Sequence, residues 1–438
     1  MVEGELMGRN LNNKIVSADE AVACVRSGDH IHLSSIASVP HILVNALCRR
    51  AKTGDLRDLH FHHFHTEGPA PYSDPEYAGI FFDQGFFCGA NVRANVQAGY
   101  ADYLPAHLFE SQLMYRSGVL PCDVAMVQVS LPDQNGMVSL GTSVDCSIAA
   151  IEVARHKIAV VNKHVPFSYG ENLPLTTFDY LVEDDTPLIT KIYKLPSSID
   201  DKIGRNCSEL VADGACIQMG IGSIPNAVAA HLKDHKNLGI HTEMFADGVL
   251  ELIEAGVING LCKKIDTGKI VASFLWGSQK VYDFIHLNSS VQMRDIAYTN
   301  NPFIIAQNTN VVSINSATEI DLTGQVCADS IGSKIYSGTG GQLDFVRGAK
   351  MSNGGKSIIA MASRTAKGHS KIVPFLKQGA GVVTPRADVQ WIVTEYGAVN
   401  LYGKSLQERA ELMISIAHPD DREWLEKTVR ENRSLISN

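Results

Sequence analysis

The sequence lacks the features that would place it in a membrane, a secretory pathway or a nucleic-acid complex. No run reaches the ~18–20 apolar residues that span a bilayer, and the start, MVEGELMGRN, has no apolar core followed by a signal-peptide cleavage site. The basic pairs Arg49–Arg50 and Lys263–Lys264 are too short to form a basic stripe, and the net charge is -9 at pH 7. We therefore expect a cytoplasmic protein that binds neither membrane nor nucleic acid.

Disulfide and zinc frameworks are also missing from the sequence. The nine cysteines are odd in number and scattered without a CxxC pair, which is typical of free thiols in a reducing compartment. Four histidines, His60, His62, His63 and His65, alternate in LHFHHFHTEG as on a strand. Because no carboxylate or cysteine completes a recognised ligand spacing, we favour a polar strand near a cleft over a metal site.

Short apolar runs alternate with amphipathic stretches along all 438 residues, a length that suggests two or three domains. VAMVQVS and KIAVVN in the first half have the composition of buried strands, as do KIVASFLWG, NVVSIN and KSIIAMAS in the second. SADEAVACVRSG has a helical pattern that opens with a capping box, Ser17 and Glu20. This alternation predicts an α/β fold with mostly parallel sheets.

The two halves of the chain share a pattern. The segment KLPSSID, with Pro and two Ser, separates them near residue 195. SGDHIHLSSIASVPHILVNAL from Ser27 and DGACIQMGIGSIPNAVAAHL from Asp213 both read as a short strand, a small-residue loop, Pro and an amphipathic helix. We therefore predict two similarly built open α/β domains, residues 1–195 and 196–438, with the active site in the cleft between them.

A glycine loop in the second half is the first candidate site. The segment from Gln218 to Pro225, QMGIGSIP, follows a predicted strand and opens a helix, a layout that favours a phosphate or an oxyanion. About 20 residues on stands Glu243, which also fits a dinucleotide site, with Gly220 and Gly222 at the pyrophosphate and Glu243 at the ribose. Pro225 replaces the third glycine of that motif, so an NAD-dependent oxidoreductase is the weaker alternative.

Three further segments carry chemistry-bearing residues. YSGTGGQLDF contains Ser337, Gly340 and Gly341, which predict a concavity rich in backbone N–H groups. Lys367, in SRTAKGHSKIVP, is suited either to a phosphate contact or to an ordinary surface position. Glu395, in VTEYGAVNLYGK, is by itself no more informative than any carboxylate in a turn.

Taken together, these segments resemble the class I coenzyme A transferases, in the acetyl-CoA hydrolase/transferase branch that includes 4-hydroxybutyrate and butyrate:acetate CoA-transferases. The resemblance covers essentially the whole chain and is most specific in HTEMFADG and GTGGQLDF. One departure is Tyr402, where many relatives have Arg in a TEYGxAxLRGK-like segment. That difference concerns a contact with the acid or with coenzyme A and leaves the core chemistry in place.

The resemblance implies a role for each candidate residue. Glu243 would be the nucleophile that carries a glutamyl-CoA thioester. The loop Gln218, Gly220, Ile221 and Gly222 would lie against the thioester end, with the Ile221 and Gly341 N–H groups as oxyanion donors. Ser337, Gly340, Gly341 and Lys367 would contact coenzyme A, and Glu395 would help to position the substrate. Coenzyme A would be a substrate, and no tightly bound cofactor or metal is implied.

The function expected from the resemblance is ping-pong transfer of CoA between an acyl-CoA and a short-chain carboxylic acid. The resemblance to this branch of the family favours acetate with butyrate or 4-hydroxybutyrate as the acids. No residue of the sequence indicates this choice. A thioesterase that uses the same glutamate remains the alternative within the same chemistry. We also expect a homo-oligomer, with a dimer as the working assumption.

Overall fold

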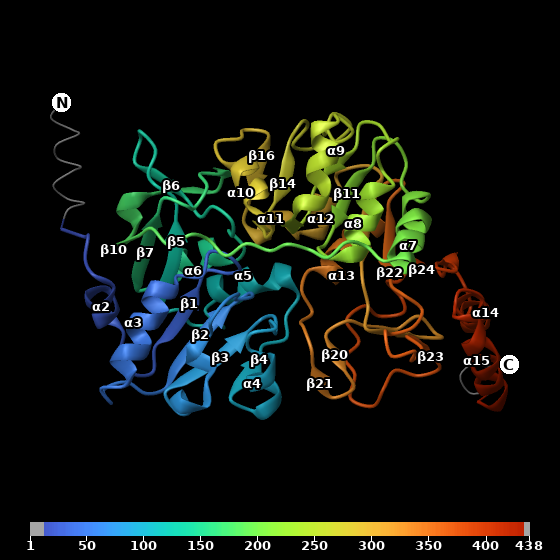
Figure 1. Ribbon diagram of the computed structural model, residues 1–438, viewed down its shortest axis with the longest axis horizontal. Coiled ribbons are helices and arrows are strands. Elements are labelled where there is room, and N and C mark those ends of the chain that lie inside the picture. Colours follow the sequence, from blue (N-terminus) through green and yellow to red (C-terminus); the bar gives the residue numbers. More distant parts are fainter. Residues whose placement is uncertain (1–12, 433–438) are drawn as a thin grey trace. The chain divides into compact units, whose positions relative to one another are not determined.

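The chain divides into two compact units in a computed structural model, which describes residues 13–432 (Figure 1). The first unit contains the chain up to Lys191 together with Ser273–Ala297, and the second contains Ile192–Ala272 and the chain from Tyr298 onward. The domain limits 1–195 and 196–438 stay a prediction, as does the location of the active site in an interdomain cleft. The segment MVEGELMGRN lies outside the described residues.

The first unit is built on a seven-stranded sheet in the order β10-β7-β5-β1-β2-β3-β4. All six pairings in this sheet are parallel. In Figure 1 its strands run from blue to green. They are β1 (His30–Leu33), β2 (Leu59–His63), β3 (Phe81–Gly85), β4 (Ala101–Tyr103), β5 (Val124–Val129), β7 (His156–Asn162) and β10 (Tyr180–Asp184). Since strand order reverses between β1 and β5, the carboxyl ends of these two strands form the switch point at which open α/β sheets bind ligands.

Between residues 13 and 191 the α-helices of this unit are α2 (Ala18–Ala21), α3 (His41–Ala51), α4 (Arg93–Ala98), α5 (Leu108–Arg116) and α6 (Ser147–Val153). Helix α2 begins with the expected capping box, in which Ser17 and Glu20 satisfy each other's backbone N–H groups. A short antiparallel pair, β6 (Met137–Ser139) and β9 (Asn172–Pro174), lies outside the large sheet. Side chains of α2, α3, β1 and β2 fill the core.

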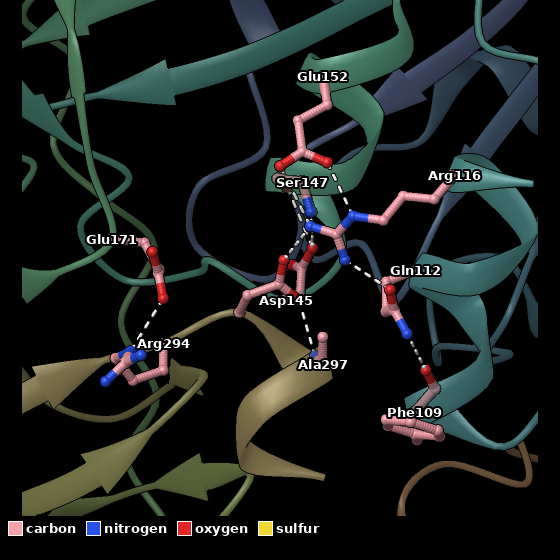
Figure 2. A network of polar contacts seen from close by, with 10 residues as sticks. Phe109, Gln112, Arg116, Asp145, Ser147, Glu152, Glu171, Arg294 and Ala297 are labelled. Atoms are coloured by element: carbon pink, nitrogen blue, oxygen red, sulfur yellow. Dashed lines mark hydrogen bonds and ion pairs between the residues drawn. The ribbon is translucent and has the colours of Figure 1, made fainter. Parts of the chain in front are cut away.

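The segment Ser273–Ala297 is held to the first unit by charged contacts (Figure 2). Arg116, at the end of α5, donates to Glu152 Oε2 and to Asp295 Oδ2, each over 2.7 Å. Arg294 donates to Glu171 Oε1 over 2.9 Å. The segment contributes α10 (Gln279–Ile285) and β16 (Val291–Met293), and β16 pairs in parallel with β8 (Tyr169–Gly170).

The second unit contains a six-stranded sheet in the order β12-β11-β17-β22-β24-β25. Its strands are β11 (Cys216–Met219), β12 (Gly239–Ile240), β17 (Val311–Asn315), β22 (Lys356–Ala360), β24 (Trp391–Thr394) and β25 (Gly397–Asn400). The pairings are parallel except for β24 with β25. Strand order reverses between β11 and β17, so the second unit has its own switch point.

The remaining elements of the second unit surround this sheet. The helices are α7 (Ser198–Ser208), α8 (Ser223–Ala230), α9 (Leu250–Glu254), α12 (Pro302–Ile305), α13 (Gln342–Met351), α14 (Leu406–Ser415) and α15 (Pro419–Glu431). Short strands β18 (Glu319–Asp321), β19 (Val326–Cys327) and β23 (Ile372–Val373) form a small sheet, and β20 (Ser330–Ile331) pairs with β21 (Lys334–Ile335). Within residues 13–432, no helix is both long and apolar enough to cross a bilayer.

The predicted α/β class with mostly parallel sheets is confirmed. The runs VAMVQVS, KIAVVN, NVVSIN and KSIIAMAS form β5, β7, β17 and β22, each largely buried. KIVASFLWG is interrupted at Ser273 and forms two shorter strands, β14 (Ile270–Ala272) and β15 (Phe274–Leu275). All nine cysteines are free thiols.

His60, His62 and His63 of the histidine cluster lie on β2, His65 follows the strand, and a fifth histidine, His30 of β1, joins them. The rings of His30 and His60 stack with their centroids 4.5 Å apart, and His30 Nδ1 lies 2.9 Å from His62 Nε2. Burial lowers the pKa of His62 to about 3 and keeps that ring neutral. Residues 13–432 contain no group of three or more His, Cys, Asp or Glu side chains placed to hold a metal ion.

Candidate active site

Glu243 lies between β12 and the short strand β13 (Met244–Phe245), and the backbone around it is held by hydrogen bonds. The N–H of His241 donates to Ile217 O of β11 (3.2 Å), and the N–H of Thr242 donates to Val271 O (2.9 Å). The Thr242 hydroxyl donates to Met244 O over 2.9 Å. Thr242 and Met244 are buried, whereas Glu243 is partly buried. The carboxylate is therefore carried on a rigid segment at the carboxyl edge of the sheet.

Two uncharged N–H donors hold the Glu243 carboxylate. Asn300 Nδ2 donates to Glu243 Oε2 over 2.9 Å, and the backbone N–H of Gly341 donates to the same carboxylate. Burial raises the pKa of Glu243 to about 7, and the two hydrogen bonds offset only part of this effect. A carboxylate that is half ionised near pH 7 is a stronger base and nucleophile than an ordinary glutamate.

Gly341 is required by close approach rather than by backbone conformation. A Cβ atom at this position would overlap Glu243 Oε2 and Asn300 Nδ2. The residue is also the N-cap of α13, a ten-residue helix whose first N–H groups and dipole favour negative charge. The second glycine segment thus brings both a hydrogen-bond donor and a helix N-terminus to Glu243.

Asn300 is a site residue that the sequence did not single out. It is fully buried, and its Oδ1 accepts from the Thr299 hydroxyl over 3.1 Å. Its Nδ2 also donates to Asp344 Oδ2 of α13 over 3.3 Å. The segment YTNNPF around Asn300 has no motif and lies far from Glu243 along the chain, so no spacing rule could have found it.

The glycine loop after β11 borders a hollow of about 280 Å³. The loop residues Gly220 to Pro225 line one side of it, and residues 314–316 at the end of β17 line the other. Gly222 has φ +120°, a conformation that favours glycine, and it caps α8. Pro225 is the third residue of α8, so this first turn loses no internal hydrogen bond.

Gln218 and Gln342 tie this loop region to neighbouring segments. Gln218 is buried and exchanges two amide hydrogen bonds with Asn315, at 3.1 and 3.4 Å. Gln342 Nε2 donates to Ser316 O over 2.7 Å. Because Gln342 follows Gly341, the hollow is connected by one hydrogen bond to the helix end that contacts Glu243. Gln218 therefore supports the loop, and its contact with coenzyme A stays a prediction.

The remaining predicted residues occupy three separate places. The Ser337 hydroxyl donates to Ala328 O (2.7 Å), and Gly340 has φ +57° just before Gly341. Lys367 is exposed in a turn closed by a hydrogen bond from Thr365 N–H to His369 O (2.8 Å). Their contacts with coenzyme A, like the oxyanion role of Ile221, stay predictions.

Glu395 has contacts of its own. Its carboxylate accepts from the Ser363 N–H and hydroxyl, over 2.9 and 2.7 Å. Nearby, burial lowers the pKa of Lys371 to about 8 although Glu395 raises it. Glu395 therefore orders the end of β22, and its role toward the substrate stays a prediction. Tyr402, at the position where many relatives have Arg, is 58% exposed and lies under Lys350 Nζ.

Comparison with known proteins establishes the family. Residues 7–192 match the acetyl-CoA hydrolase/transferase N-terminal domain, and residues 277–429 match the acetyl-CoA hydrolase/transferase C-terminal domain. The chain belongs to the acetyl-CoA hydrolase/transferase family. The resemblance identified from the sequence and the expected enzyme class, a CoA-transferase, are thereby confirmed. Glu243 falls between the two matched segments, so its assignment depends on the geometry described above.

Relatives and solved structures agree with this family. A succinyl-CoA:acetate/propanoyl-CoA:succinate CoA transferase of Fasciola hepatica is 45% identical over 94% of this chain and 86% of its own. A 4-hydroxybutyrate coenzyme A transferase of Clostridium kluyveri is 43% identical over 94% of this chain and 96% of its own. The crystal structure of RipA from Yersinia pestis has a TM-score of 0.92 at 37% identity, covering 97% of this chain and 98% of that one.

Proposed function

We propose that this CoA-transferase works by a ping-pong mechanism through a glutamyl-CoA thioester on Glu243. The observation that carries the proposal is a single, largely desolvated carboxylate with a pKa near 7, held by the uncharged donors Asn300 and Gly341. No basic partner neutralises it in these contacts, so its electron pair is available for attack. After the carboxylate has reacted, Glu243 Cδ carries a carbonyl oxygen. That oxygen also needs uncharged hydrogen-bond donors.

The reaction proceeds in two balanced half-reactions. A Glu243 oxygen attacks the thioester carbonyl carbon, the C–S bond breaks, and CoA thiolate leaves from a mixed anhydride. The thiolate then attacks Glu243 Cδ, the C–O bond of the anhydride breaks, and the first acid leaves as its carboxylate. A second carboxylate reverses these steps on glutamyl-CoA and leaves as a CoA ester. The thioester energy is conserved at every step.

Each tetrahedral intermediate on Glu243 Cδ carries an oxyanion that requires hydrogen-bond donors. The Asn300 amide and the Gly341 N–H already occupy positions beside Oε2 and serve this purpose, and the loss of one such donor typically costs about 10²–10³ in rate. The Ile221 N–H serves the thioester carbonyl of the incoming acyl-CoA. The hollow beside Gly220 and Gly222 supports this assignment because it connects through Ser316 and Gln342 to Gly341.

Coenzyme A acts as a substrate, and we assign no tightly bound cofactor. Its polyanionic end takes contacts from Ser337, Gly340 and the exposed Lys367. The acids are short-chain carboxylates, with acetate and butyrate or 4-hydroxybutyrate as first candidates. The Clostridium kluyveri relative supports a four-carbon acid, and the Fasciola hepatica relative adds succinate and propanoate to the panel. A homo-oligomer and a cytoplasmic location complete the proposal.

A dinucleotide site at the same residues receives no such support. In that arrangement Glu243 would accept from a ribose hydroxyl, but Pro225 stands in place of the third glycine of the dinucleotide motif. A site at which the acid is desolvated beside a helix N-terminus is better suited to an ester or thioester intermediate than to a sugar hydroxyl.

The test is to trap the intermediate. The protein is incubated with acetyl-CoA, then reduced with borohydride, and the modified residue is located by peptide mass spectrometry. We expect Glu243 to be converted to the alcohol in a CoA-dependent manner. In parallel, CoA release is measured with and without acetate, butyrate, 4-hydroxybutyrate, succinate and propanoate. A modification on another residue would overturn the nucleophile, and CoA release that ignores every added acid would establish a hydrolase.

A further inference from the structure

The Asn300 amide contacts two carboxylates at once. Its Nδ2 donates to Glu243 Oε2 (2.9 Å) and to Asp344 Oδ2 (3.3 Å). A carboxamide nitrogen carries two hydrogens, so both are used, one for each carboxylate. The amide oxygen on the other side accepts from the Thr299 hydroxyl (3.1 Å). Every polar atom of the Asn300 side chain is therefore engaged in a defined direction.

Asp344 is the partner that fixes this direction. If the amide turned by 180°, its oxygen would face two carboxylate oxygens and both hydrogen bonds would become repulsive contacts. Without Asp344, only Glu243 would oppose the flip, and that opposition would weaken once the charged carboxylate has become the carbonyl of a neutral thioester. Asp344 is 5% exposed and lies in the first turn of α13, the helix whose N-cap is Gly341. It is thus rigidly placed on the element that supplies the second donor.

We propose that Asp344 is a positioning residue for the reaction on Glu243, where it keeps the NH₂ group of Asn300 directed at the reacting carboxyl throughout the cycle. This inference depends on the proposed function, because the orientation matters most when a carbonyl or an oxyanion occupies the place of Oε2. Asp344 itself touches neither the acid nor coenzyme A in this account. It acts through Asn300.

The charge of Asp344 gives the proposal a signature that a purely structural role lacks. Both carboxylate oxygens bind the same nitrogen, so they lie within roughly 6 Å of each other, close enough for like charges to disfavour joint ionisation. His241 and Tyr298 are further ionisable side chains near this corner: His241 Nε2 lies 2.9 Å from Thr299 O, and its ring centroid lies 6.1 Å from that of Tyr298. Burial is the main cause of the raised pKa of Glu243. From the short separation of the two carboxylates we expect loss of the Asp344 charge to ease the ionisation of Glu243 further and to move the acidic limb of the rate profile to lower pH.

The experiment compares three variants of the full chain. Asp344→Asn keeps an acceptor oxygen and removes the charge, whereas Asp344→Ala removes both. Asp321→Asn is the matched control, because Asp321 is also a buried carboxylate of the second unit (3% exposed) and is held by Thr323 and Gln325. For each variant, kcat and KM for acyl-CoA are measured from pH 5 to 9, with thermal unfolding as a check on folding.

We expect Asp344→Ala to lower kcat about 100-fold with KM changed less than about threefold, the cost of one misdirected oxyanion donor. Asp344→Asn should lose less of its kcat than the alanine variant. The acidic limb of its rate profile should lie roughly one pH unit lower than in wild type. Asp321→Asn should leave the limb in place.

The proposal is overturned if Asp344→Asn keeps both the wild-type kcat and the wild-type limb. The proposal is also overturned if Asp344→Asn loses no more kcat than Asp321→Asn and its acidic limb stays at the wild-type pH. Should the alanine variant not fold, the asparagine variant decides. Borohydride labelling of wild-type Glu243 tests the chemistry independently, so failure of the positioning role and failure of the nucleophile are distinguishable.

Discussion

The same tripeptide occupies the same topological position in the two units, with different consequences. His65-Thr66-Glu67 follows β2, which pairs with β1, and His241-Thr242-Glu243 follows β12, which pairs with β11. In each unit a helix, α3 or α8, connects the two strands. Glu67 Oε1 lies 2.9 Å from His65 Nε2, whereas Glu243 is held by the uncharged groups of Asn300 and Gly341. Sequence and topology place both acids alike, but the groups that surround the two carboxylates differ.

The loops that precede α3 and α8 also have different surroundings. In the first unit Ser34 Oγ donates to Ser38 O (2.5 Å) and Ser38 Oγ bonds Thr142 Oγ1 (2.6 Å), so the loop is closed on itself. In the second unit the glycine loop borders an open hollow. A hollow of about 230 Å³ also exists at the switch point of the first unit, lined in part by His41, Gln128 and Asp184. Within the described residues of the second unit, the hollow lies beside a glycine loop, and the same unit carries the acid whose pKa is raised by burial.

The largest expected effect comes from replacing the two matching acids, Glu243 and Glu67. Glu243→Ala should lower transfer by at least about 10³-fold, because it removes the attacking atom. Glu67→Ala is the matched variant and should stay within about tenfold of wild type and still be labelled on Glu243 after borohydride. Steady-state transfer and peptide mass spectrometry measure both. Retention of a tenth of the activity by Glu243→Ala would remove Glu243 from the nucleophile role.

A smaller effect is expected when the neighbours of Glu243 are disturbed and the acid is kept. The Cβ of Gly341→Ala overlaps Glu243 Oε2 and Asn300 Nδ2, so kcat should fall about 10²–10³-fold. Gly220→Ala provides the steric comparison, because a Cβ there meets nothing within 4 Å and should cost less than the Gly341 change. Single-turnover labelling of Glu243 reports the difference. Equal losses in the two variants would contradict the close-approach argument.

Local patterns predicted much of the fold. The strands β5, β7, β17 and β22 and the capping box at Ser17 follow from apolar runs and short spacing rules, which act over a few residues. The glycine segments around Gly222 and Gly341 were found because unusual backbone conformation and close approach select glycine at the sequence level.

Long-range pairing could not be predicted in this way. The contacts of Arg116 with Asp295 and of Arg294 with Glu171 hold Ser273–Ala297 to the first unit (Figure 2), yet none of these charges differs locally from a surface residue. Asn300 and the environment of Glu395 were missed for the same reason. A side chain whose role is defined by a partner far along the chain leaves no periodic signal.

The smallest expected effect concerns stability and follows from the raised pKa of Glu243. The folded-state pKa is about 7, against an ordinary value of 4.5 for a glutamate in water. A raised folded pKa means that the folded state holds its proton more tightly. The resulting stabilisation is fully present below pH 4.5 and is lost as pH rises through 7. At pH 8 the ionised carboxylate therefore costs the folded second unit up to about 3 kcal/mol.

Glu243→Gln removes this cost, so the variant should unfold at a higher temperature than wild type at pH 8 and at nearly the same temperature at pH 4.5. Thermal unfolding followed by circular dichroism measures the difference, and Glu254→Gln, at an exposed position of α9, controls for the loss of one carboxylate. A stabilisation that is independent of pH would mean that packing, rather than ionisation, distinguishes Glu243 from Glu67. The environment would then no longer explain why only one of the two matching acids is poised to react.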